Sequence, residues 1–183
     1  NTKRARSKSP LSLIYVSLGR NINATKNIHS ALDNLEQQFG ICLISSVYES
    51  KSLGFHGKNF LNLVVTIQSN LPINELLNVL KKFEDLLKRD RSAPKFSNRT
   101  MDIDILCVDG LSGNFDGIHL PRAEILKNAF VLLPLAEIAP DCKHPCTGLT
   151  YSDHWQMFNI GLQSLWKVDF FWRGKQISFR QYT

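Results

Sequence analysis

The hydrophobic and polar positions of this chain predict strands and helices in alternation. Residues 11–18 form a short apolar run, which is typical of a buried strand. Residues 22–39 then place apolar side chains three to four positions apart, as on one face of a helix, and Gly40 marks the end of that helix. The chain therefore opens with a strand followed by a helix.

Two further strands and a second helix follow. Residues 41–48 are strand-like, and residues 60–67 alternate between apolar and more polar side chains, as expected of a strand. The connection over residues 49–59 contains two glycines and has no clear periodicity, and long connections in compact domains are often functional. Pro72 then precedes an amphipathic helix whose apolar stripe runs over residues 73–87.

A basic segment and one more strand complete this part of the chain. The order strand, helix, strand, strand, helix, strand predicts a mixed α/β (α+β) fold with a ferredoxin-like βαββαβ core. A hairpin over residues 108–118, a helix over 130–138 and C-terminal helices would make this a three-layer αβα arrangement. We therefore expect one domain over residues 11–165, with a C-terminal extension or the start of a linker over 166–183.

The last of these strands carries the most specific chemical pattern, N-R-T-M-D-I-D-I-L over residues 98–106. Because side chains alternate along a strand, Asp102 and Asp104 would share one face, with their Cα atoms about 6.5 Å apart. Two carboxylates at this spacing can ligate one hard cation or flank two, as in a Mg²⁺ site. The alternation alone, however, also describes an ordinary strand with one face in water.

Basic side chains gather immediately before these acids. Phosphoryl transfer needs metal ions and cations that neutralise phosphate charge, so acids and bases together indicate that chemistry. The first cations also suit a helix C-terminus, whereas the later ones lie beyond the predicted helix. On the helix itself, Glu84 falls on the apolar stripe, either at the rim of a pocket or as a tolerated edge residue. The basic residues are Lys88, Arg89, Arg91, Lys95 and Arg99.

The composition changes this picture mainly through its charge. The 183 residues are 43% hydrophobic and 21% charged, which is ordinary for a globular domain, and the net charge is +6. Four of the positive charges lie in residues 1–10, which contain no acid and which we expect to be a basic arm or linker. Since the rest of the chain is nearly balanced, we expect no nucleic-acid-binding face, and no 20-residue apolar span predicts a membrane helix.

The cysteines and glycines exclude several other classes. Four cysteines, at 42, 107, 142 and 146, are too few and too dispersed for a disulfide scaffold, so a reducing cytosol is expected. Cys142, His144 and Cys146 could begin a zinc site, but a fourth ligand is missing, which favours a surface loop. The sequence contains neither a P-loop nor the glycine-rich loop of protein kinases.

In this order of elements, the motif R-T-x-D-x-D-I over residues 99–105 resembles the signature of 6-hydroxymethyl-7,8-dihydropterin pyrophosphokinases. The resemblance covers about residues 11–139. It implies Mg²⁺-dependent transfer of pyrophosphate from ATP to the hydroxymethyl group of the pterin, giving the pterin diphosphate and AMP in folate biosynthesis. It also implies a cytoplasmic enzyme, with covalent or non-covalent association with dihydropteroate synthase or dihydroneopterin aldolase.

The resemblance implies a role for each matching position. Asp102 and Asp104 would hold two Mg²⁺ ions that bridge the phosphates of ATP, and with Arg91 and Arg99 they would form the catalytic group. The ATP-binding positions would be Glu84, Arg89, Arg91, Lys95, Arg99, Ile105 and Arg122. The pterin-binding positions would be Ser50, Lys51, Leu53, Phe60, Asn62, Asp102 and Phe130. Without the resemblance, the two phenylalanines would more often be core residues.

Four positions depart from the residues usual in the family. Arg20 stands where serine is usual, Phe96 where tryptophan is often found, Arg122 where histidine is frequent, and Asn128 where a second basic residue is expected. These departures concern ATP contacts, whereas the metal and pterin positions match. Two alternatives therefore stay open: a ferredoxin-like nucleic-acid-binding module, which would usually display paired aromatic residues on its sheet, and a catalytically impaired homologue that acts as a scaffold.

Overall fold

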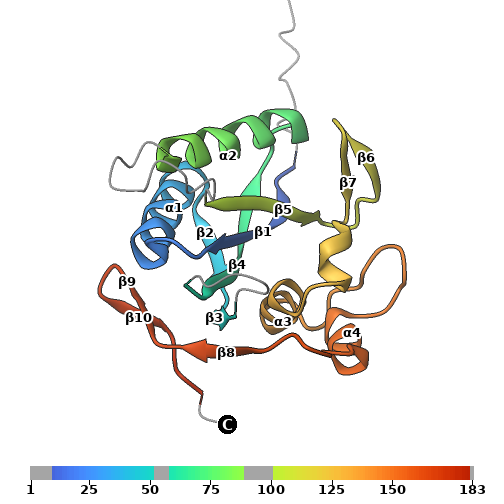
Figure 1. Ribbon diagram of the computed structural model, residues 1–183. Coiled ribbons are helices and arrows are strands. Elements are labelled where there is room, and N and C mark those ends of the chain that lie inside the picture. The colour runs from blue at the N-terminus through green and yellow to red at the C-terminus, as the bar shows by residue number, and fades with distance from the viewer. Residues whose placement is uncertain (1–9, 52–57, 89–100, 182–183) are drawn as a thin grey trace, which may run out of the picture.

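A central antiparallel sheet with helices on both faces forms the body of the molecule (Figure 1). The computed structural model describes residues 10–51, 58–88 and 101–181. Its first part has the predicted βαββαβ order, with the second strand divided in two. The elements are β1 (Ser12–Arg20), α1 (Ala24–Phe39), β2 (Ile41–Ile44), β3 (Val47–Ser50), β4 (Phe60–Ser69), α2 (Ile73–Lys88) and β5 (Asp102–Val108).

The second part adds a hairpin, shorter helices and three more strands. The predicted hairpin forms, although its strands lie a few residues later than expected, and the predicted helix near residue 130 is present. The elements are β6 (Gly113–Phe115), β7 (Ile118–Leu120), the 3₁₀ helix η1 (Ala123–Leu126), α3 (Ala129–Ile138), α4 (Tyr151–Met157), β8 (Leu165–Val168), β9 (Phe170–Trp172) and β10 (Lys175–Ser178).

The strands of the sheet follow the order β5-β1-β4-β3-β8, and β2 also pairs with β4. The predicted second strand is interrupted at Ser45, whose side chain replaces a backbone acceptor. The Val64 amide donates to Ser45 Oγ at 2.9 Å, while the Ser45 amide donates to the Val64 carbonyl at 2.9 Å. A side-chain acceptor in the ladder divides the strand into β2 and β3.

The two faces of the sheet pack against different helices, as the alternation of side chains predicts. Val16 and Leu63 belong to the core under α1 and α2. Their neighbours Tyr15 and Val64 belong to the second core, under α3 and α4. The sheet therefore separates two layers of helices, and the three-layer αβα prediction is confirmed (Figure 1).

The chain after α4 forms strands, which the sequence analysis did not assign. Strand β8 begins at residue 165, the predicted end of the domain, and continues into the expected extension. The β9–β10 turn is made by Arg173 and Gly174, with φ of 50° and 74°. Arginine is unusual at such a position, so this turn is difficult to predict from the residue types. None of the helices in the described ranges is long and apolar enough to cross a lipid bilayer.

Candidate functional site

Three neighbouring strands align the predicted metal and pterin residues in rows across the sheet. Gly19 of β1 pairs with Asp102 of β5 on one side and with Asn62 of β4 on the other. In the next row, Ser17 pairs with Asp104. Directly paired residues in an antiparallel ladder project to the same face, so both carboxylates and the Asn62 carboxamide share the face covered by α3.

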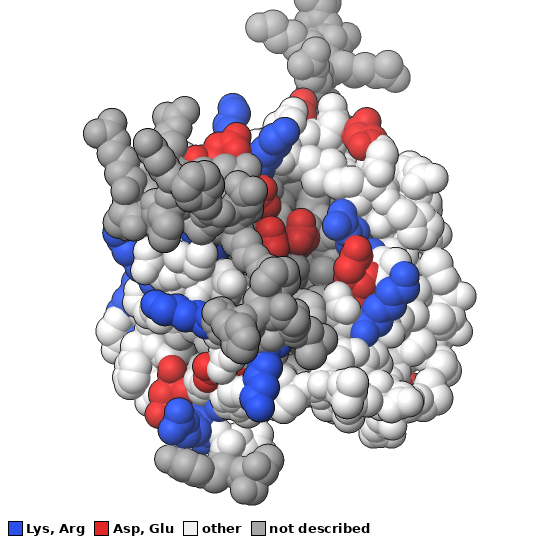
Figure 2. Space-filling model, in the orientation of Figure 1, with Lys and Arg blue, Asp and Glu red and all other residues white. Residues whose placement is uncertain are grey.

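These side chains border one cavity of about 240 Å³ between the sheet, η1 and α3. Figure 2 shows acidic and basic side chains around a hollow in the middle of this face. The cavity brings together five of the predicted residues: Asn62, Asp102, Asp104, Arg122 and Phe130. The remaining lining residues are Ser17, Gly19, Leu106, Glu124, Asn128 and Val131.

Gly19 leaves the space that the Asn62 side chain occupies. A Cβ atom at position 19 would lie only 2.5 Å from Asn62 Oδ1. Real Cβ atoms do not approach an oxygen this closely, so either the carboxamide or the strand would have to shift. The glycine near the end of β1 therefore allows Asn62 to lie across the row that it shares with Asp102.

The Asp104 carboxyl lies in an electrostatically mixed environment. Burial raises its pKa above the ordinary value; the charge of Arg122 opposes this shift and that of Glu124 adds to it. Arg122 Nε itself donates to Glu124 Oε2 at 3.4 Å. The ionised form of Asp104 is therefore disfavoured in this protein alone, and a cation bound beside it would offset that cost.

The donor set at this site fits Mg²⁺. This ion typically uses one or two carboxylates and completes its octahedron with water and substrate phosphates. Asp102 is exposed at the mouth of the cavity and Asp104 is partly buried behind it. Among the described residues no group of three or more His, Cys, Asp or Glu side chains could hold a metal by itself. Water and phosphate oxygens would therefore supply the remaining ligands.

Glu84 connects helix α2 to the strand of the two aspartates. Its Oε1 accepts a hydrogen bond of 2.9 Å from the backbone amide of Ile103, the residue between Asp102 and Asp104. A charged acceptor on this amide fixes the strand at the point from which both carboxylates project. The spacing left Glu84 open between a pocket rim and an edge position, and the family resemblance assigned it to ATP binding. The structure gives it this contact with the strand, and the contact with ATP stays a prediction.

The other predicted pterin residues described here continue the same face. Ser50 pairs with Phe60, two positions from Asn62, so both project to the side of the cavity. Ser50 is buried, and Lys51 beside it is exposed. By contrast, the side chain of Ile105 belongs to the core under α1 and α2, on the opposite face, so only its backbone could meet a ligand.

Several predicted residues lie outside the described ranges, and their roles stay predictions. They are Leu53, Arg89, Arg91, Lys95 and Arg99.

Six residues at the cavity were not among the predicted site residues, among them Ser17, Gly19 and Glu124. Ser17 and Gly19 occupy alternate positions of β1, so the period of two that located the acids could also have indicated them. Glu124 lies close to Arg122 on η1. Its place at the cavity depends on how η1 folds over the sheet, which hydrophobic periodicity does not predict.

Comparison with protein families assigns residues 15–140 to 7,8-dihydro-6-hydroxymethylpterin-pyrophosphokinase (HPPK), in good agreement with the extent of the resemblance seen in the sequence. The chain is 35% identical over 137 residues to a 2-amino-4-hydroxy-6-hydroxymethyldihydropteridine pyrophosphokinase of Aquifex aeolicus, covering 74% of this chain and 85% of the relative. A Bacillus subtilis protein of the same name is 30% identical over 139 residues, with 74% and 83% covered.

Longer proteins also contain a similar part. The folic acid synthesis protein fol1 of Pneumocystis carinii is 30% identical over 175 residues, which cover 92% of this chain but only 23% of that protein. Plasmodium falciparum HPPK-DHPS shares the fold, with a TM-score of 0.67 at 15% identity, covering 92% of this chain and 50% of that one. Together with the matched residues 15–140, these similarities show that the chain belongs to the 7,8-dihydro-6-hydroxymethylpterin-pyrophosphokinase family.

Proposed function

We propose that this chain transfers pyrophosphate from ATP to the hydroxymethyl group of 6-hydroxymethyl-7,8-dihydropterin, in a Mg²⁺-dependent reaction. One observation supports this proposal most strongly. The carboxylates of Asp102 and Asp104 border the same cavity as Asn62 and Phe130, so a metal-bound phosphate and a flat heterocycle could meet there. The family membership of the chain supports the same reaction.

Asp102 and Asp104 would hold two Mg²⁺ ions between them and the phosphates of ATP. When bound, these ions would neutralise the phosphate oxygens and draw charge from the transferring group. Arg122, at the cavity wall, would add a permanent positive charge on the same side. We also propose, from the sequence, that Arg91 and Arg99 contribute to this neutralisation.

The pterin would lie between aromatic side chains. Phe130, at the start of α3, borders the cavity, and Phe60 projects from β4 to the same face of the sheet. Stacking on such rings gives a flat heterocycle contact area and a fixed orientation. The Asn62 carboxamide offers both a donor and an acceptor, which suits the alternating donors and acceptors along a pterin edge.

In the proposed reaction the pterin hydroxymethyl oxygen attacks the β-phosphorus of ATP in line with the leaving group. An oxygen–phosphorus bond to the pterin forms, the bond between the β-phosphorus and the α,β-bridging oxygen breaks, and AMP leaves. The proton of the hydroxymethyl group is released to water. Among the described residues that line the cavity, none is a histidine that would serve as a general base. Positioning and charge neutralisation by the acids and cations would therefore provide most of the acceleration.

The identity of the products tests this proposal. The chain is incubated with ATP and 6-hydroxymethyl-7,8-dihydropterin, with and without Mg²⁺, and the nucleotides are separated by chromatography. Pyrophosphate transfer predicts AMP in equal amount to the pterin diphosphate, and only with Mg²⁺. Formation of ADP would indicate attack at the γ-phosphorus instead. Binding of RNA without any turnover would support the nucleic-acid-binding alternative, and absence of both would support the scaffold alternative.

We further propose that the chain works in a reducing compartment such as the cytoplasm and beside another enzyme of the folate pathway. All four cysteines are free thiols, which fits a reducing environment. Association with dihydropteroate synthase is supported by similar chains named HPPK-DHPS, of which this chain spans about half. Dihydroneopterin aldolase is the other partner that the sequence suggested.

A further inference from the structure

The Glu49 carboxylate joins three segments of the chain at one end of the sheet. Glu49 lies on β3, and its Oε2 accepts a hydrogen bond of 3.0 Å from the indole Nε1 of Trp166 on β8. Its Oε1 accepts a second hydrogen bond of 3.1 Å from Nδ2 of Asn59, the residue before β4. One side chain therefore connects the end of β3, the start of β4 and the C-terminal strand.

This connection lies directly behind two of the proposed pterin residues. Ser50 follows Glu49 and pairs with Phe60 on one side and with Leu165 on the other. Because successive residues point to opposite faces, Glu49 holds the backbone from the α1 side while Ser50 projects to the side of the cavity. The carboxylate is thus placed to set the spacing between Ser50 and Phe60 without reaching a substrate.

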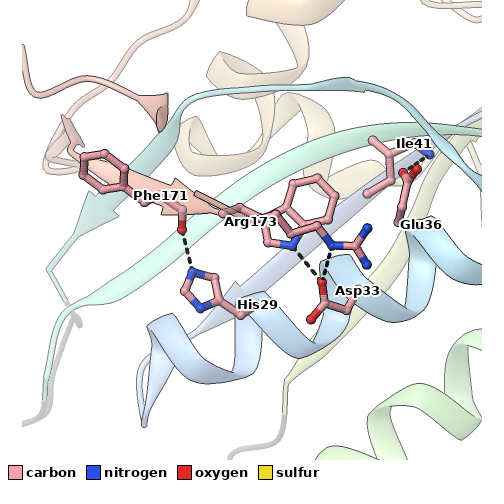
Figure 3. Close-up of polar contacts among 7 residues, drawn as sticks. His29, Asp33, Glu36, Ile41, Phe171 and Arg173 are labelled. Carbon is pink, nitrogen blue, oxygen red and sulfur yellow. Dashed lines mark hydrogen bonds and ion pairs between the residues drawn. The ribbon is translucent and has the colours of Figure 1, made fainter. Parts of the chain in front are cut away.

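Strand β8 is itself held in place by the C-terminal hairpin. Ser178 Oγ donates to the carbonyl of Val168 at 2.6 Å and accepts from the Val47 amide at 2.9 Å, which links β10, β8 and β3. On the other side, Figure 3 shows His29 and Asp33 of α1 pointing toward the hairpin. His29 Nε2 bonds to the Phe171 carbonyl at 2.6 Å. Trp166 therefore projects from a fixed strand.

We infer that Trp166 and Glu49 are positioning residues of the pterin site, acting through the backbone of β3 and β4. The inference rests on the proposed function, since it assigns Ser50 and Phe60 to pterin binding. The C-terminal segment then has a role in pterin binding. The indole N–H of Trp166 binds the Glu49 carboxylate, and this carboxylate holds the end of β3 and the start of β4 together. The two aspartates lie on β5, at the opposite edge of the sheet, and Arg122 lies at the start of η1, so these residues should be unaffected.

Replacing Trp166 by phenylalanine tests this inference, because it removes the N–H group and keeps an aromatic ring. The chain offers a matched control in Trp172→Phe, away from Ser50. This variant removes the hydrogen bond of 3.0 Å from the Trp172 indole on the hairpin to Asp33 of α1, while Arg173 keeps its own bond of 2.9 Å to Asp33. Pterin affinity is measured by calorimetry without ATP, and KM for pterin and for ATP in the AMP-release assay. Trp166→Phe should weaken pterin binding about tenfold, as expected for one lost hydrogen bond to a charged group.

The two KM values separate positioning from general damage. Trp166→Phe should raise KM for the pterin and leave KM for ATP unchanged, whereas Trp172→Phe should change neither. Glu49→Gln, which keeps the shape of the side chain but loses its charge, provides a second variant and should weaken pterin binding by a smaller factor. Thermal unfolding of all three variants shows that the compared proteins are folded.

Wild-type pterin affinity in both Trp166→Phe and Glu49→Gln would overturn the inference, as would equal losses of pterin and ATP affinity. A wild-type chain that neither binds nor converts the pterin would overturn the proposed function, and with it the inference. The wild-type measurement therefore distinguishes the two failures before any variant is compared.

Discussion

Gly19 and Asn62 face each other across the β1–β4 ladder so closely that a methyl group on Gly19 would meet the Asn62 carboxamide oxygen at 2.5 Å. The contact lies in the row that also contains Asp102, on the wall of the cavity. The glycine thus serves the site by leaving room, since it places no side chain between the proposed pterin-reading amide and the metal-binding acid.

Gly19→Ala should therefore displace Asn62 and impair turnover. We expect kcat/KM for the pterin to fall by about tenfold to a hundredfold, because small displacements at a binding site have effects of this size. The control is Gly110→Ala, where an added Cβ has nothing within 4 Å, and it should change kcat/KM by less than about twofold. Equal kinetics for the two variants would show that the Asn62 position is unimportant.

Glu84 should contribute to stability through its bond to the Ile103 amide. Glu84→Ala leaves that amide without its charged acceptor, so the free energy of unfolding in urea should fall by about 1–3 kcal/mol. Glu84→Gln retains an oxygen acceptor and should lose less. If Glu84→Ala were as stable as the wild type, the contact would not fix the strand of the two aspartates.

Asp104 should weaken the fold at neutral pH. Because burial raises its pKa, the folded state binds this proton more tightly than the unfolded state. Stability is therefore lost as pH rises from the ordinary carboxyl value of about 4 through the raised folded value. Asp104→Asn should unfold at a higher temperature than the wild type at pH 7, and the gain should shrink as pH falls toward that ordinary value.

Thermal unfolding of both proteins across this pH range checks the prediction. Saturating Mg²⁺ and ATP should also raise the unfolding temperature of the wild type, by mass action, and should have a smaller effect on Asp104→Asn. An Asn variant less stable than the wild type at pH 7 would mean that the ionised carboxylate is well accommodated without a metal.

Cys107 should be chemically inert in the folded protein. Burial raises the pKa of its thiol to about 12, and Tyr151 OH donates to its sulfur at 3.6 Å. Iodoacetamide at pH 8 should therefore modify the exposed Cys42, Cys142 and Cys146, and reach Cys107 only in denaturant. Peptide mass spectrometry identifies the modified residues, and rapid labelling of Cys107 in the native protein would contradict the core packing described above.

Most of the fold could be predicted because its elements are amphipathic in a simple way. Strands β1, β4 and β5 each alternate between the two cores, and α2 presents one apolar stripe to the sheet. The strands after residue 165 were not predicted. The run over 166–172 is rich in apolar residues, and the turn that follows it uses Arg173 with positive φ, where arginine is unusual. The pairing of β8 with β3 is a long-range contact, which local periodicity does not predict.

The site residues that lie on predicted strands could be predicted from the sequence. Alternation placed Asp102 and Asp104 on one face, and the family resemblance added Asn62 on a neighbouring strand. The register that aligns Gly19 between them, and the approach of Arg122 and Glu124 from η1, depend on long-range pairing and on a short helix over the sheet. Sequence reasoning therefore identified the acids together with Asn62, Arg122 and Phe130, and it missed Ser17, Gly19 and Glu124.

The central claim, that the two aspartates hold the metal for pyrophosphate transfer, is tested most directly by AMP release from Asp104→Asn. The substitution keeps the shape of the side chain and removes one metal-binding charge. The matched control is Asp116→Asn in the exposed β6–β7 turn, where φ of 50° suits asparagine. We predict that Asp104→Asn releases AMP at least about a thousandfold more slowly than the wild type, with Asp116→Asn unchanged. Near-normal Mg²⁺-dependent AMP release by folded Asp104→Asn would contradict the account.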